Sequence, residues 1–155
     1  YWNNAAETQI ALRMHHGKIW LFTGDAARID QDGYITIVDR VKDMVNVGGY
    51  KVYSVEVEAV IAQHPAVLSC AILAEPDKQQ STELVKLVVQ RATEYSERDE
   101  AELTGDILHY CREKLAAYKV PRSIEFIETM PLTPIGKVDK KALRAYLRSK
   151  QSGVK

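Results

Sequence analysis

The chain has 155 residues and a mass of 17.5 kDa, a size that allows one hydrophobic core, or one domain with part of another. Lys and Arg number 21, as do Asp and Glu, so no net charge attracts nucleic acid or an anionic membrane, and nucleic-acid binding is disfavoured. The two cysteines, Cys70 and Cys111, and the four histidines show no metal-ligand spacing, and no apolar run is long enough to span a membrane.

The first quarter of the chain predicts a helix, a strand and a hairpin. Residues 5–14 carry scattered apolar side chains that predict a weak helix, and the apolar run at residues 19–22 predicts a short buried strand. Residues 26–30 and 34–38 flank an Asp32-Gly33 turn, and Asp-Gly supplies the positive φ that a hairpin loop requires. The chain starts with two aromatic residues rather than Met, so we expect it to be cut from a longer protein.

Helices and strands alternate in the rest of the chain. Ser54 is placed to cap a helix that runs to about residue 64. Apolar residues at four-residue spacing predict an amphipathic helix over residues 99–118. Asp139 is predicted to cap a last helix, which has a basic outer face and the inward side chains Leu143, Tyr146 and Leu147. Further strands are predicted at residues 44–47, 67–73, 84–89 and 120–127.

Residues 39–43, Asp-Arg-Val-Lys-Asp, place four charges between two apolar, β-branched runs. Such a polar joint between two strands is a candidate hinge, and an ordinary charged turn is the alternative. Gly48-Gly49 follows the second run, where two glycines permit either a tight hairpin turn or a close approach of the main chain to a ligand.

Two other segments carry groups that suit a nucleotide substrate. In Thr23-Gly24-Asp25, the glycine lets the backbone approach a ligand and the carboxylate can accept two hydrogen bonds from a vicinal diol such as a ribose; a plain turn is the alternative. Residues 130–138 form a loop that two prolines stiffen, and this loop presents Lys137. It is not a phosphate-binding P-loop, because the Gly-x-x-x-x-Gly-Lys-Ser/Thr spacing is absent.

Together, Thr23-Gly24-Asp25, the 39–43 joint with Gly48-Gly49, and the 131–138 loop resemble the last three core motifs of the adenylate-forming enzymes, in the same order. These enzymes include the acyl-CoA synthetases, firefly luciferases and peptide-synthetase adenylation domains. The resemblance implies an α+β fold, a small mobile C-terminal domain in which helices flank a small, mainly antiparallel sheet, preceded by a β-hairpin remnant of the large N-terminal domain. It also implies domain boundaries: residues 1–38 would end the large AMP-binding domain, 39–42 would be the hinge and 43–155 the C-terminal lid domain.

The resemblance implies roles in the first half-reaction, adenylate formation, for three residues. Asp25 would hold the ribose hydroxyls of ATP and of the acyl-adenylate, and Arg40 would lie near the same ribose and phosphate. Lys137 would be the catalytic lysine that reaches the site while adenylate forms. A flexible ammonium suits this step, because negative charge builds up when a carboxylate attacks the α-phosphate.

The resemblance also implies roles for four residues in the change to the second half-reaction, thioester formation. Lys42 matches the hinge position, about which the small domain is thought to rotate before thioester formation. Gly48, Gly49 and Tyr50 match the loop that then lies beside the pantetheine channel of CoA.

The resemblance implies a fragment of an ATP-dependent acid–thiol ligase of the acyl-CoA synthetase type. The enzyme would activate a carboxylic acid, fatty or other acyl, as acyl-AMP and transfer it to CoA. The absent N-terminal domain would be the lobe's partner and would bind most of the ATP with its Mg²⁺, so the fragment alone is expected to be inactive. The absence of any disulfide pattern favours a cytoplasmic location.

Two alternatives remain open. The motif around Lys137 is equally at home in peptide-synthetase domains, so the parent could instead load an amino or aryl acid onto a carrier protein. A non-catalytic protein-binding module derived from this lobe is the other alternative. Two residues depart from the family pattern: Ser54 replaces a frequent proline, and Thr82 stands before Glu83 where glycine is usual.

Overall fold

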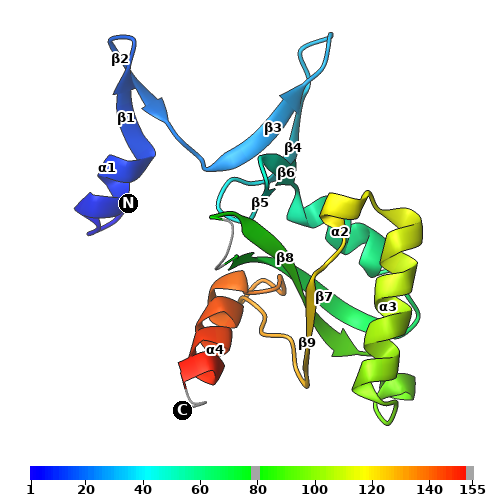
Figure 1. Ribbon diagram of the computed structural model, residues 1–155. Coiled ribbons are helices and arrows are strands. Elements are labelled where there is room, and N and C mark those ends of the chain that lie inside the picture. Colours follow the sequence, from blue (N-terminus) through cyan, green and yellow to red (C-terminus); the bar gives the residue numbers. More distant parts are fainter. Residues whose placement is uncertain (78–80, 153–155) are drawn as a thin grey trace. The chain divides into compact units, whose positions relative to one another are not determined.

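A computed structural model describes residues 1–77 and 81–152 of the chain (Figure 1). The chain divides into two compact units, Tyr1–Lys42 and Asp43–Lys155. Each unit has its own helices and strands.

The first unit begins with a helix, α1 (Ala5–Ala11), and a hairpin formed by β1 (Leu12–His15) and β2 (Lys18–Leu21). The helix predicted over residues 5–14 is therefore too long. His16 and Gly17 both have positive φ and form a two-residue turn that sets Leu12 opposite Leu21. The residues after Ala11 are thus paired as a strand and are not available to extend the helix.

The predicted strand at residues 19–22 is present as β2, but it is exposed rather than buried. Trp20 has an exposed fraction of 53%, and its indole nitrogen donates to the carbonyl of His15 at 3.1 Å. Within the described residues of this unit, β2 pairs with β1 alone and its side chains are left uncovered. The other tryptophan, Trp2, is also in this unit and is fully exposed.

The predicted hairpin at residues 26–38 is confirmed as β3 (Asp25–Ile29) and β4 (Ile35–Arg40). The Asp30 carboxylate accepts from the backbone N–H groups of Asp32 at 3.0 Å and Tyr34 at 2.9 Å, and Gly33 has a φ of +87°. Side chain and glycine together fix the turn.

The second unit is built on a three-stranded sheet in the order β7 (Val67–Pro76), β8 (Glu83–Arg91) and β9 (Ser123–Ile127). β7 and β8 are antiparallel, whereas β9 runs parallel to β8. A short hairpin, β5 (Val45–Val47) and β6 (Tyr50–Val52), precedes them. The predicted strand at residues 120–127 starts later, at Ser123, because residues 117–119 form a 3-10 turn, η2, and Pro121 has no N–H to donate to a ladder.

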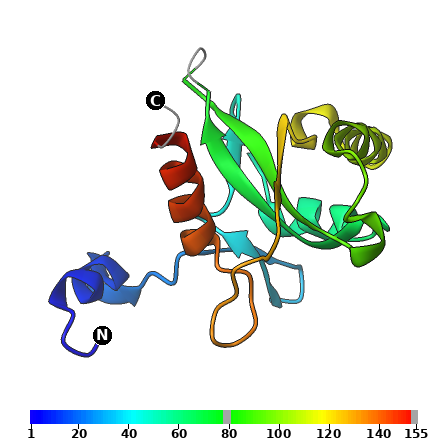
Figure 2. The same cartoon turned by 90° about the horizontal axis from the view of Figure 1, so that it is seen from below.

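Helices cover both faces of this sheet. Figure 2 shows α4 (Lys140–Ser152) on one side, and α2 (Ser54–Ile61) and α3 (Glu100–Lys114) on the other. Strand side chains alternate between the two faces: Ile72 packs in the core with α2 and α3, whereas its neighbours Ala71 and Leu73 pack with Leu143 and Leu147 of α4. A short 3-10 segment, η1 (Thr93–Tyr95), follows β8. The predicted α+β fold with a mainly antiparallel sheet is confirmed.

Helix ends differ from the predictions in three places. Tyr53, not Ser54, is the N-cap of α2; Ser54 is the buried first helical residue, and α2 ends at Ile61 in a turn. Asp99 caps α3 through the N–H groups of its first turn, but α3 ends at Lys114 because Leu115 is extended. None of the described helices has the length and apolar character needed to cross a membrane.

Candidate functional site

Asp25 and Arg40 are brought together by the β3–β4 hairpin. The Asp25 carboxylate and the Arg40 Nε lie 2.8 Å apart, with the aspartate one-quarter exposed and the arginine half exposed. A bulge between Ala26 and Ala27 shifts the register by one residue. Without that shift Asp25 would stand opposite Asp39, so the bulge replaces a like-charge pair by an ion pair.

The backbone beside this pair is fixed by Thr23 and Gly24. The Thr23 hydroxyl accepts from the Asp25 N–H at 3.2 Å, and Gly24, with a φ of +77°, accepts from the Val41 N–H at 2.9 Å. An open hollow of about 720 Å³ within this unit is lined by Thr23, Gly24, Asp25 and Arg40, among others. An anionic and a cationic group therefore face one hollow, a combination that can receive a hydroxyl and a phosphate of one ligand.

Gly48 and Gly49 form the two-residue turn of the β5–β6 hairpin. Their φ values are +55° and +91°, and they connect Val47 to its partner Tyr50. Positive φ at both positions strongly favours glycine. The alternative of a plain hairpin turn is thus correct for the local structure, and it leaves the turn's function open.

Tyr50, the third residue of this predicted loop, is 62% exposed and stacks on Tyr118 of η2. Their ring centroids are 4.8 Å apart at an interplanar angle of 26°. Next to Tyr118, the Lys119 ammonium is bound to Glu56 at 2.5 Å. The ring stack holds one side of the hairpin against η2, and the ion pair joins η2 to α2.

Thr82 and Glu83 hold the other side of the same hairpin. The Thr82 hydroxyl accepts from the Gly48 N–H at 2.7 Å and donates to the Asn46 carbonyl at 2.9 Å. The Glu83 carboxylate accepts from the Asn46 N–H at 2.7 Å. Sequence reasoning noticed Thr82 only as a departure from a family pattern, because a contact across 34 residues leaves no local signal.

Lys137 lies on an exposed loop whose backbone is closed on itself. Thr133 and Lys137 are joined twice: the Thr133 N–H donates to the Lys137 carbonyl at 2.7 Å, and the Lys137 N–H donates to the Thr133 hydroxyl at 3.1 Å. A bridge between Leu132 and Val138 closes the loop base. Within residues 1–77 and 81–152 the Lys137 ammonium makes no hydrogen bond or ion pair, so a rigid loop presents a lysine that is available to a ligand.

The helix that follows this loop is anchored firmly. Asp139 accepts from the N–H groups of Lys141 and Ala142, each at 3.0 Å, which confirms it as the cap of α4. The Lys140 ammonium lies 2.7 Å from both the Glu58 carboxylate and the hydroxyl of buried Ser54. Ser54 thus has a partner on α4. Because Lys140 is the first residue of α4, these bonds also fix the chain just after the Lys137 loop.

A second anchor of α4 reaches back to the unit boundary. Arg144 binds the carboxylate of Asp43, the first residue of the second unit, at 2.6 Å. Of the three apolar side chains predicted to face inward, Leu143 and Leu147 are buried, whereas Tyr146 is 46% exposed.

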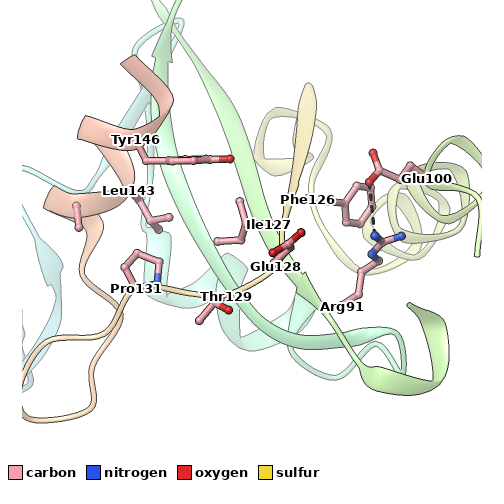
Figure 3. Close-up of a pocket in the computed structure, with 10 residues that line it drawn as sticks. Arg91, Glu100, Phe126, Ile127, Glu128, Thr129, Pro131, Leu143 and Tyr146 are labelled. Atoms are coloured by element: carbon pink, nitrogen blue, oxygen red, sulfur yellow. Dashed lines mark ion pairs between the residues drawn. The ribbon is translucent and has the colours of Figure 1, made fainter. Parts of the chain in front are cut away.

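Tyr146 instead lines a cavity of about 620 Å³ that holds none of the predicted site residues (Figure 3). Arg91 crosses one end, where its guanidinium lies 3.6 Å from the Glu100 carboxylate and 5.5 Å from the centre of the Phe126 ring. Figure 3 shows Glu128 between this end and the α4 end. Arg91 already has partners there, so its guanidinium is not reserved for a ligand.

Neither cysteine is a candidate nucleophile. Burial is the main cause that raises the pKa of Cys70 to about 12 and that of Cys111 to about 11, so both thiols stay protonated at neutral pH. Among the described residues, no three His, Cys, Asp or Glu side chains are grouped to hold a metal ion.

Comparison with known proteins identifies the family of the chain. The sequence pattern of the AMP-binding enzyme C-terminal domain matches residues 56–137, just over half of the chain. The chain belongs to this family. The AMP-binding C-terminal domain is part of the adenylate-forming enzymes, so the resemblance drawn from the three motifs is confirmed.

Curated relatives of this AMP-binding C-terminal domain are acyl-CoA ligases. A medium/long-chain-fatty-acid–CoA ligase of Mycobacterium tuberculosis is 38% identical over 148 residues, which cover 94% of this chain and 25% of the relative. A long-chain-fatty-acid–CoA ligase of Salmonella typhimurium is 40% identical over 131 residues, 84% of this chain and 22% of the relative. The chain spans about a quarter of the length of the curated relatives it matches.

Solved structures of similar chains lead to the same family as the curated relatives. An anthranilate CoA ligase in complex with anthranoyl-AMP is 39% identical with a TM-score of 0.70, over 84% of this chain and 25% of that one. The ATP-bound MatB of Rhodopseudomonas palustris is 32% identical with a TM-score of 0.74, over 96% of this chain and 28% of that one. The fold and the family of the AMP-binding C-terminal domain are thus shown by sequence and structure alike.

Proposed function

We propose that this chain works as the C-terminal part of an ATP-dependent acid–thiol ligase, which forms acyl-AMP from a carboxylic acid and then transfers the acyl group to CoA. The relatives' names favour a fatty or other acyl acid as substrate. By itself the chain is expected to be inactive, because its described residues include neither an acid pocket nor a complete nucleotide site.

The observation that carries the proposal is the division of the chain into two compact units at Lys42. The Asp25–Arg40 pair belongs to one unit, whereas the Lys137 loop and the Gly48-Gly49 turn belong to the other. Such a division suits a ligase with two half-reactions, because it allows a group that serves adenylation to leave before the thiol arrives. We therefore assign Lys42 as the hinge between residues 1–38 of the large domain and the lid at 43–155.

In the first half-reaction, Asp25 and Arg40 are proposed to bind the nucleotide. The Asp25 carboxylate accepts hydrogen bonds from the ribose hydroxyls, while Arg40 holds it in place and supplies positive charge beside the phosphate. Lys137 is proposed as the catalytic residue. Its ammonium contacts the acid carboxylate and the α-phosphate, where negative charge increases as the acyl–oxygen–phosphorus bond forms and pyrophosphate departs.

In the second half-reaction, the thiol of CoA replaces AMP on the acyl carbon. The Gly48-Gly49 turn is proposed to lie along the pantetheine arm, because residues without a Cβ let a narrow chain pass close to the main chain. Tyr50 is proposed to border the same channel from its stacked position on Tyr118.

The full-length protein provides the test. We expect acid-dependent exchange of labelled pyrophosphate into ATP, which reports adenylation, and CoA-dependent release of AMP, which reports thioester formation. A panel of short, medium and long fatty acids and aryl acids identifies the acid, and a phosphopantetheinylated carrier protein offered in place of CoA tests the alternative acceptor. The 155-residue chain alone serves as the control without activity.

Two outcomes would contradict the proposal. A full-length protein that shows no exchange with any acid of the panel would exclude adenylation. Exchange followed by transfer to the carrier protein but not to CoA would retain adenylation and replace the acceptor.

A further inference from the structure

The hydroxyl of Thr82 joins two backbone groups of the glycine hairpin. It accepts from the Gly48 N–H at 2.7 Å and donates to the Asn46 carbonyl at 2.9 Å, so both its donor and its acceptor capacity are used. Thr82 itself is held by the β7–β8 connection, where its carbonyl accepts from the Asp77 N–H at 2.9 Å. Among the twenty side chains, only Thr or Ser presents such a hydroxyl on so short an arm.

These bonds occupy the outer edge of β5. The hairpin pairs Val45 with Val52 and Val47 with Tyr50 along the inner edge, so the backbone groups of Asn46 point the other way. Thr82 and Glu83 cover this outer edge with side chains instead of a strand. The position of the hairpin relative to the sheet is therefore set by side chains.

The turn itself provides little stiffness. Gly48 and Gly49 have no atoms near the position of an added Cβ, and glycine has the largest conformational freedom of any residue. The Thr82 bonds lie close to solvent, so water can replace them when the hydroxyl is removed. Loss of the hydroxyl should thus change the order of the turn far more than the stability of the fold.

We propose that Thr82 is a positioning residue for the CoA-dependent half-reaction. Its hydroxyl holds the Gly48 amide in the conformation that the pantetheine arm meets, and it takes no part in adenylation. This inference rests on the proposed function, because it assigns the Gly48-Gly49 turn to the thiol step.

The test compares Thr82→Val with Thr82→Ser in the full-length protein. Valine keeps the shape and removes the hydroxyl, whereas serine keeps the hydroxyl. Thr82→Val should lower kcat/KM for CoA by about threefold to tenfold and leave pyrophosphate exchange within about twofold of wild type; Thr82→Ser should restore the CoA step. Amide hydrogen exchange at Gly48 should accelerate by a similar factor in Thr82→Val, with unchanged exchange in β7 and β8.

The outcomes separate the two levels of the proposal. If wild type catalyses both half-reactions and Thr82→Val does so equally well, the positioning role is wrong and the proposed function stands. An equal loss in both half-reactions would also overturn the role, because it would indicate general damage. If wild type shows no pyrophosphate exchange, the proposed function fails and the link to CoA fails with it.

Discussion

At the scale of single residues, the exposed Lys137 ammonium on its closed loop is the group with the sharpest expected effect. In the full-length protein, Lys137→Ala should lower the rate of adenylate formation roughly a hundredfold or more, because one charge contact in the transition state typically contributes about 3 kcal/mol. Thioester formation from pre-made acyl-adenylate should remain. Lys141→Ala, which removes an exposed lysine of α4, is the matched control. Equal loss in both half-reactions would show that Lys137 does not have this role.

His64 should make the stability of the chain depend on pH. Burial lowers the pKa of His64 below its ordinary 6.5, against the opposing effect of Asp106, and its Nδ1 accepts from the Ala66 N–H at 3.2 Å. The unfolded chain therefore binds the proton first. The contribution of neutral His64 to the free energy of unfolding is complete above pH 6.5. It is lost as the pH falls from 6.5 to the lower pKa of the folded state.

Urea unfolding at about pH 7.5 and about pH 5.5 measures this dependence. Wild type should lose more unfolding free energy between the two conditions than His64→Gln, which cannot titrate. Identical losses in the two proteins would show that His64 does not contribute.

At the scale of elements, α4 depends on its cap. Asp139 accepts hydrogen bonds from two N–H groups of the first turn. Its negative charge also offsets the positive charge of the adjacent lysines and of the N-terminal end of the helix dipole. Asp139→Ala should lower the free energy of unfolding by about 1 kcal/mol, and Asp139→Asn by much less, since asparagine also caps well. Urea denaturation followed by circular dichroism provides the measurement. An alanine variant as stable as wild type would show that the cap is dispensable.

The elements also show what the sequence could predict. The runs of β7 and β8 and the four-residue spacing in α3 are long enough to decide between strand and helix. In the first unit, Leu12 and Met14 alternate with polar residues, a period-two signal that the longer helix prediction overlooked. The exposure of β2 could not be predicted, because an apolar run does not say whether another layer covers it.

The candidate site also has features that the sequence predicted and features that it did not. The Asp-Gly turn predicted the β3–β4 hairpin, but the bulge that sets Arg40 rather than Asp39 opposite Asp25 has no evident sequence signal. The glycine turn was foreseen as one of two possibilities. Its attachment to Thr82 was not, because that contact depends on where the chain returns after β7.

At the scale of the whole molecule, the proposed hinge predicts how the two half-reactions separate. Lys42→Pro fixes φ at one residue and restricts the residue before it, so it should hinder rotation. In the full-length protein we expect the complete reaction to slow about tenfold or more, with one half-reaction affected far more than the other. Lys42→Ala keeps the backbone free and should stay within a few-fold of wild type. Wild-type rates for both half-reactions in Lys42→Pro would show that the hinge lies elsewhere.

The location of the two tryptophans has a practical consequence for such experiments. Trp2 and Trp20 both belong to the Tyr1–Lys42 unit, and the sequence contains no other tryptophan. Indole absorbs at longer wavelengths than phenol, so selective excitation of this chain collects emission from that unit alone, and both rings are exposed enough to meet a soluble quencher. The 155-residue chain thus contains an intrinsic optical label on one side of Lys42, which needs no attached dye.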